Sequence, residues 1–123
     1  MEGNRENTLK EKLKNDLSED ALMFEMSNLL PCRTGLKYQV WYSAHSYGLE
    51  PRIKVDIPEG KSIYIQIENH EVEGDIDKIA SKEVQRIFDW IDLNKEALLK
   101  YWNEAPAGKI DTVEMNNLLK RIK

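Results

Sequence analysis

The sequence contains a single cysteine, Cys32, and this scarcity excludes two kinds of covalent or metal cross-link. One chain with one cysteine forms no internal disulfide and builds no zinc site from cysteines. No stretch approaches the run of about 20 apolar residues that a membrane helix needs, and the first residues lack the apolar core of a signal peptide. We therefore expect a soluble cytoplasmic protein, without membrane association, in a reducing compartment.

Basic residues are fewer than acidic residues in this sequence. The chain has 18 Lys and Arg against 22 Asp and Glu, which gives a net charge of −4. Because phosphate contacts need clustered basic side chains, this balance argues against a dedicated nucleic-acid-binding protein, although it leaves room for a local basic patch. A length of 123 residues is typical of one domain. We place that domain at residues 21–123, after an N-terminal extension, residues 1–20, that is disordered or forms a weak helix.

The clearest strand signals are residues 52–57 and 62–67, which alternate strictly between apolar and polar side chains. Alternation predicts strands with one buried and one solvated face, and the short link between them predicts an antiparallel hairpin. Residues 36–43 are aromatic and β-branched and predict another strand, with Trp41 on the solvated face. Residues 21–30 fit a strand ending near Leu29 or a helix, and we favour the strand.

Helical periodicity is strongest from Ser81 to Trp102, with a polar interruption at Asn94. We expect two helices or one bent helix, with Asp92 or Asn94 capping the second, and we assign Trp90 and Trp102 to the core. We expect a last helix that is capped by Asp111, with Ile110 and Met115 forming a hydrophobic staple. Its predicted apolar side consists of Val113, Leu118, Leu119 and Ile122. The predicted fold is α+β, a mainly antiparallel sheet of about four strands with the C-terminal helices packed on its Ile and Val face.

The most suggestive surface is the predicted solvated face of the sheet together with the loop of its first hairpin. Its candidate binding residues are Trp41, Tyr47, Arg52 and Lys54, with Tyr64 beside them. Aromatic and cationic side chains occur together in protein interfaces and in platforms for single-stranded nucleic acids. The alternative is structural, because Trp41 is also a candidate for burial under the N-terminal segment or a dimer mate.

Catalytic and metal signatures are weak. His45 is the better of two histidines, since His70 lies in the acidic loop 68–77, but the sequence places no nucleophile beside either. The acidic loop lacks the ligand offsets and the sixth-position glycine of an EF-hand, so we interpret it as a solvated loop. We expect no cofactor and no metal.

Several short motifs are similar to a family of short, uncharacterised bacterial proteins. They cover roughly residues 27–120: Ser27-Asn28-Leu29, Thr34-Gly35-Leu36, Val40-Trp41-Tyr42-Ser43, Pro51-Arg52-Ile53-Lys54-Val55, and Trp90-Ile91-Asp92-Leu93-Asn94 followed by Leu98, Leu99, Tyr101 and Trp102. The resemblance implies a small α+β domain and no established activity. Members of that family carry a histidine directly before the Pro-Arg pair, where this chain has Leu49 and Glu50, and this departure weakens a catalytic role for His45.

From these observations we expect a small non-enzymatic binding domain, acting on a protein partner or as a homodimer. One alternative is a toxin-like or nucleic-acid-directed protein that uses Trp41, Arg52 and Lys54. A second alternative is a small hydrolase that uses His45.

Overall fold

The structure is a computed structural model that describes residues 24–44 and 49–122. The predictions for the extension 1–20, for His45 and for Tyr47 therefore fall outside the described residues. None of the helices in the described part combines the length and the apolar character of a membrane span.

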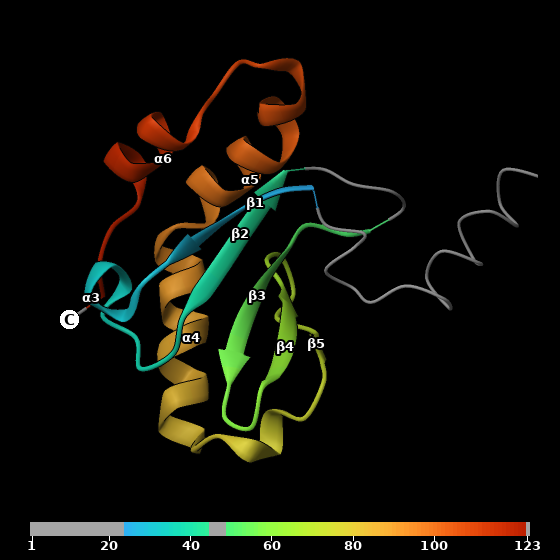
Figure 1. The fold of residues 1–123 in the computed structure, drawn as a ribbon, viewed down its shortest axis with the longest axis vertical. Coiled ribbons are helices and arrows are strands. Elements are labelled where there is room, and N and C mark those ends of the chain that lie inside the picture. Colours follow the sequence, from blue (N-terminus) through green and yellow to red (C-terminus); the bar gives the residue numbers. More distant parts are fainter. Residues whose placement is uncertain (1–23, 45–48, 123) are drawn as a thin grey trace, which may run out of the picture.

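Five strands form one antiparallel sheet in the order of the chain (Figure 1). They are β1 (Phe24–Leu29), β2 (Val40–Ala44), β3 (Arg52–Ile57), β4 (Lys61–Gln66) and β5 (Val72–Glu73). The four expected strands are confirmed, including the strand interpretation of β1. The fifth, β5, forms inside the predicted acidic loop, where it pairs with Tyr64 and Ile65 of β4.

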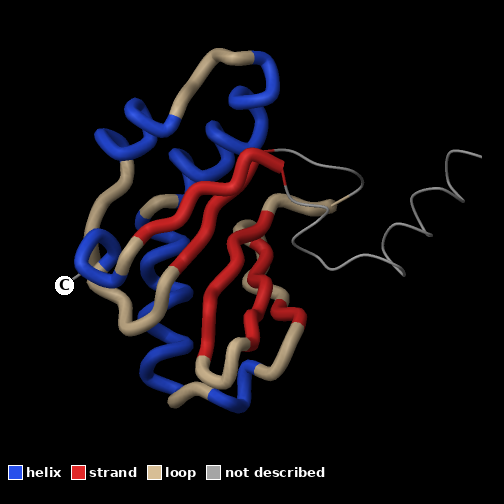
Figure 2. The backbone as a smooth tube through the Cα atoms, viewed as in Figure 1, coloured by secondary structure: helices blue, strands red, loops and turns tan. Residues whose placement is uncertain are grey.

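The helices are α3 (Pro31–Thr34), α4 (Ser81–Leu93), α5 (Lys95–Glu104) and α6 (Thr112–Leu118), with short 3-10 turns at Ile76–Lys78 and Ala105–Ala107. The predicted α+β fold is thus confirmed, as is the division of the Ser81–Trp102 stretch into two helices. The tube view shows α4 crossing one face of the sheet, with α5 and α6 beyond it toward the β1 side (Figure 2). The strand β2 begins at Val40 and not at the expected Leu36, because the chain continues to bend through residues 35–38 after α3.

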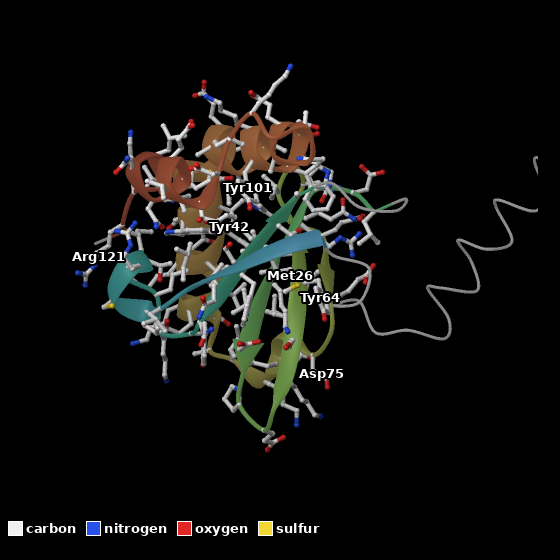
Figure 3. The ribbon with its side chains drawn as sticks, turned by 45° about the horizontal axis from the view of Figure 1, so that its top comes forward. Met26, Tyr42, Tyr64, Asp75, Tyr101 and Arg121 are labelled. Carbon is white, nitrogen blue, oxygen red and sulfur yellow. The ribbon has the colours of Figure 1, made fainter. Side chains whose placement is uncertain are left out.

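The core lies between the Ile and Val face of the sheet and the helices α4 and α5. Its fully buried side chains include Ile53, Val55, Ile63 and Ile65 from β3 and β4, and Trp90, Ile91 and Leu98 from the helices. Tyr42 and Tyr101 meet edge to face with ring centroids 4.8 Å apart, and Figure 3 shows them side by side. Burial raises the pKa of the Tyr42 hydroxyl above its ordinary value of 10.0, while a hydrogen bond with Ser27 acts in the opposite direction.

Asn94 lies between α4 and α5, as expected, but its side chain does not cap α5. Its amide donates to the carbonyl oxygens of Trp90 and Lys120, each at 3.0 Å, and its side-chain oxygen accepts from the Lys120 N–H at 2.7 Å. The capping role was therefore wrong. The side chain is buried, and its amide is satisfied by backbone groups of α4 and of the C-terminal segment.

The last helix follows its predicted start but not its predicted face. Asp111 accepts from the Glu114 N–H at 2.9 Å, and both staple residues, Ile110 and Met115, are buried. Val113 is 68% exposed and Leu118 is also exposed, so their assignment to the apolar side was wrong. Met115 takes the inward position, and Val113 lies about 200° around the helix from it.

The C-terminal segment closes the domain against α3. The Ile122 N–H donates to the Thr34 carbonyl oxygen at 2.8 Å, and the Arg33 guanidinium donates to the Asn116 carbonyl oxygen at 3.0 Å. Gly35 has a φ of 83°, and a Cβ there would collide with the Ile122 carbonyl. Only glycine combines this left-handed turn with such a close approach.

Candidate functional site

The candidate site is the outer face of the sheet, which we define as the face opposite α4 and α5. One row of directly paired residues crosses all five strands on this face: Asn28, Trp41, Lys54, Tyr64 and Glu73. Directly opposite residues of neighbouring antiparallel strands project to the same side of a sheet. The pairing therefore brings two of the predicted site residues, Trp41 and Lys54, together.

Asp56 organises the centre of this face. Its carboxylate accepts from the Trp41 indole Nε1 at 2.8 Å and from the Ser62 hydroxyl at 3.1 Å. The Lys54 Nζ lies 3.8 Å from the same carboxylate and 5.4 Å from the centre of the Trp41 ring. A cation over an indole ring is attracted by the electrons of the ring face. These contacts hold Trp41 in one orientation.

Arg52 lies further along β3 on the same face. Its Nε donates to the Glu50 carbonyl oxygen at 3.1 Å, and its Nη1 lies 3.5 Å from the Glu73 carboxylate. The sequence predicted that Arg52 and Lys54 would be solvated, and this was wrong, because both are buried.

The two ion pairs of the outer face share an orientation. The Arg52 side chain is 5% exposed and its partner Glu73 is 57% exposed, while Lys54 is 11% exposed and Asp56 is 39% exposed. In both pairs the cation lies deep and the carboxylate lies at the surface. A molecule that approaches this face therefore meets carboxylates before it meets cations, which reverses the charge that the sequence suggested.

A small second apolar cluster adjoins the site. Leu49 and Trp102 are buried in it, and Met26 and Tyr64 pack partly against it. Figure 3 shows Met26 and Tyr64 on the sheet, with Tyr64 projecting from β4 near the middle of the outer face. Trp102 is therefore a packing residue, as predicted, but it lies apart from the main core.

His70 occupies a more ordered position than a solvated loop histidine. Its Nε2 lies 2.8 Å from an Asp92 carboxylate oxygen, and its ring stacks on Phe88 with centroids 4.5 Å apart. These contacts fasten the β4–β5 loop to α4, and a φ of 61° at His70 shows how tightly the loop turns. Within residues 24–44 and 49–122, no three His, Cys, Asp or Glu side chains cluster closely enough to hold a metal ion.

Comparison of the chain with protein-family models, with curated proteins and with solved structures gave no match in any of the three. The family resemblance drawn from the short motifs therefore stays a prediction.

Sequence reasoning missed the acidic half of the site. Asp56 and Ser62 were assigned to the solvated sides of their strands, and they lie opposite each other because the link between Ile57 and Lys61 has three residues. A link of four residues, from Ile57 to Ser62, would have given another register, so the sequence did not find this pair. Glu73 was hidden, because the two-residue strand β5 has no periodicity to recognise.

Proposed function

We propose that this protein is a binding domain without catalytic activity of its own, and that its outer face recognises basic and apolar side chains of a partner protein. The observation that carries this proposal is the orientation of the two ion pairs, which places the carboxylates of Asp56 and Glu73 outward around Trp41 and Tyr64. Protein interfaces are enriched in aromatic residues held in fixed orientations.

The charge arrangement distinguishes this proposal from the nucleic-acid alternative. Phosphate recognition needs cations that a phosphate can reach, and Arg52 and Lys54 are buried and paired with carboxylates. Exposed carboxylates repel a phosphate backbone and attract lysine and arginine, so this face favours a basic protein surface. The alternative predicts RNA or DNA gel shifts at low salt that vanish as salt rises.

The test uses the full chain as bait in extracts of its source cells, with paired charge variants. The outer-face variant carries Glu73→Gln and Asp75→Asn, which are both exposed and close to β4. The control carries Asp89→Asn and Glu96→Gln on exposed positions of α4 and α5, so that it loses the same charge elsewhere. We expect a partner that the wild type and the control capture and that the outer-face variant loses.

A second bait, Trp41→Ala, tests the aromatic part of the surface, and thermal unfolding verifies that each variant is folded. The same partner should be lost with Trp41→Ala, since large rigid aromatics carry much of the energy of an interface. Capture that is equal for the wild type and both outer-face baits would contradict the proposal.

A further inference from the structure

The two edges of the sheet are built differently. At one edge, β5 is only two residues long and is followed by Gly74 and Asp75. At the other edge, β1 has six residues and contains neither proline nor lysine. Natural proteins protect sheet edges with short strands, charges and proline, because an open edge pairs with other chains. Among the described residues, no strand other than β2 pairs with β1.

The backbone of Asn28 points out from this edge. The Asp56 N–H donates to the Gln39 carbonyl oxygen at 2.9 Å, so Gln39 bonds β3 and the next residue, Val40, bonds β1. Val40 lies opposite Leu29, so Leu29 directs its backbone groups to β2. Alternate residues bond opposite neighbours, and the N–H and carbonyl of Asn28 therefore face the open side.

A groove runs beside this edge. Its volume is about 450 Å³, and its walls come from β1 and from the segment between α5 and α6, including Met26, Ser27, Tyr101, Ala105, Ile110 and Thr112. Met26 and Ser27 lie where the pairing register of β1 shifts between Phe24 and Ser27, and both line the groove beside this edge strand. The only charged residue that lines it is Asp111, whose Oδ1 caps α6.

From this geometry we infer that a short extended segment of a partner protein docks in the groove as a sixth strand, pairing with Asn28 of β1. Such strand addition takes its affinity from main-chain hydrogen bonds and its specificity from pockets for alternate side chains. Met26 and Ile110 in the walls accept one aliphatic side chain of the segment, and Asp111 favours a lysine or arginine in it.

The groove fits a single segment better than a second copy of this chain. A symmetric pairing of two β1 strands is isologous, so each copy contributes the same surface. In such a dimer, residues 108–112 of each copy would lie beside the paired β1 strands. The same segment of the other copy would already occupy the space there. A single strand from a partner meets no such obstacle.

This inference shares with the proposed function the idea of a protein partner, but it uses a different surface. The test selects random linear peptides, displayed on phage, against the full chain. Enriched peptides should alternate apolar and polar residues and carry a basic residue. They should bind Asn28→Ala as well as the wild type, because the backbone is kept, and Asn28→Pro roughly tenfold more weakly, because the outward N–H is lost.

A second pair of variants keeps the test independent of any effect of proline on folding. Thr112→Arg fills the groove from an exposed position, and Val113→Arg places the same side chain one residue away, outside the groove. Only Thr112→Arg should weaken peptide binding. Failure to enrich any peptide, or equal binding to Asn28→Pro and Thr112→Arg, would overturn the inference.

Two further results separate the possible occupants and proposals. A wild-type dimer in sedimentation that Asn28→Pro dissociates would replace the partner segment with a second copy and overturn the inference. Variants Glu73→Gln and Asp75→Asn should leave peptide binding unchanged, so a failed outer-face proposal is recognised separately from a failed strand-addition proposal.

Discussion

The inner and outer faces of the sheet come from the same strands, yet different forces hold their side chains in place. Inward residues such as Ile53 and Ile65 are fully buried and pack by shape and apolar area alone. Outward residues such as Trp41 and Lys54 are positioned by directional contacts with Asp56. Buried ion pairs add little net stability relative to well-packed apolar side chains, so the outer face gains less from its charges than the inner face gains from its apolar area.

The largest expected effect breaks the inner face. Ile65→Ala removes a fully buried side chain from the middle of β4, and we expect the free energy of unfolding to fall by about 3 kcal/mol. Urea denaturation measures the change. The control, Gln66→Ala, alters the next residue on the outer face and should stay within about 0.5 kcal/mol of the wild type. Equal costs at the two positions would contradict the comparison of the faces.

The next effect breaks the outer face. Asp56→Ala removes the acceptor of the Trp41 indole N–H and of the Ser62 hydroxyl, and we expect a loss of about 1–2 kcal/mol in unfolding free energy. The NMR resonance of the Trp41 indole proton should shift as its hydrogen bond disappears. Asp56→Asn is the control, because it keeps the acceptor oxygen and removes the charge. An unchanged indole resonance in Asp56→Ala would show that this bond does not orient Trp41.

A smaller effect concerns Tyr42, a polar ring buried on the inner face. Since burial raises the pKa of Tyr42 in the folded state, the unfolded chain releases this proton first as the pH passes 10.0. The contribution of Tyr42 to stability is present below that pH and is lost as the pH rises through the folded-state pKa. Tyr42→Phe should therefore flatten the decline of unfolding free energy at alkaline pH. An alkaline decline as steep in Tyr42→Phe as in the wild type would contradict this prediction.

The smallest expected effect sharpens the comparison. Lys54→Met keeps the length and apolar stem of the side chain and removes its charge, and we expect the unfolding free energy to change by less than about 0.5 kcal/mol. Asp56 is partly exposed, so water can solvate it when the lysine is gone. A loss above about 2 kcal/mol would show that the ion pair serves stability, contrary to its proposed role in recognition.

The regular parts of this fold were readable from sequence because local patterns specify them. Strict alternation located β3 and β4, and the polar interruption at Asn94 divided α4 from α5. The Asp111 cap was found because its bond spans only three residues. In each case the information lies within a few neighbouring residues.

The parts that sequence reasoning missed depend on distant segments. Alternation predicted the face to which Lys54 projects but not how far its side chain is buried. That burial depends on residues of other strands, such as Trp41, which pairs with it. The side-chain hydrogen bond of Asn94 is made with the carbonyl oxygen of Lys120, which is 26 residues away in the sequence. The shared face of Trp41 and Lys54 was thus predicted correctly, whereas the burial of Arg52 and Lys54 was missed.

The contact between Ile122 and Thr34 also has a consequence for how the protein is made. It joins positions 88 residues apart, and the Arg33–Asn116 bond beside it spans 83. Contacts of such separation form late, because the chain must first close a long loop. During synthesis, α3 and the turn at Gly35 leave the ribosome long before the segment that covers them. Until residues 116–122 follow, this corner of the domain stays uncovered, and a chaperone or a partner that acts during translation can reach it.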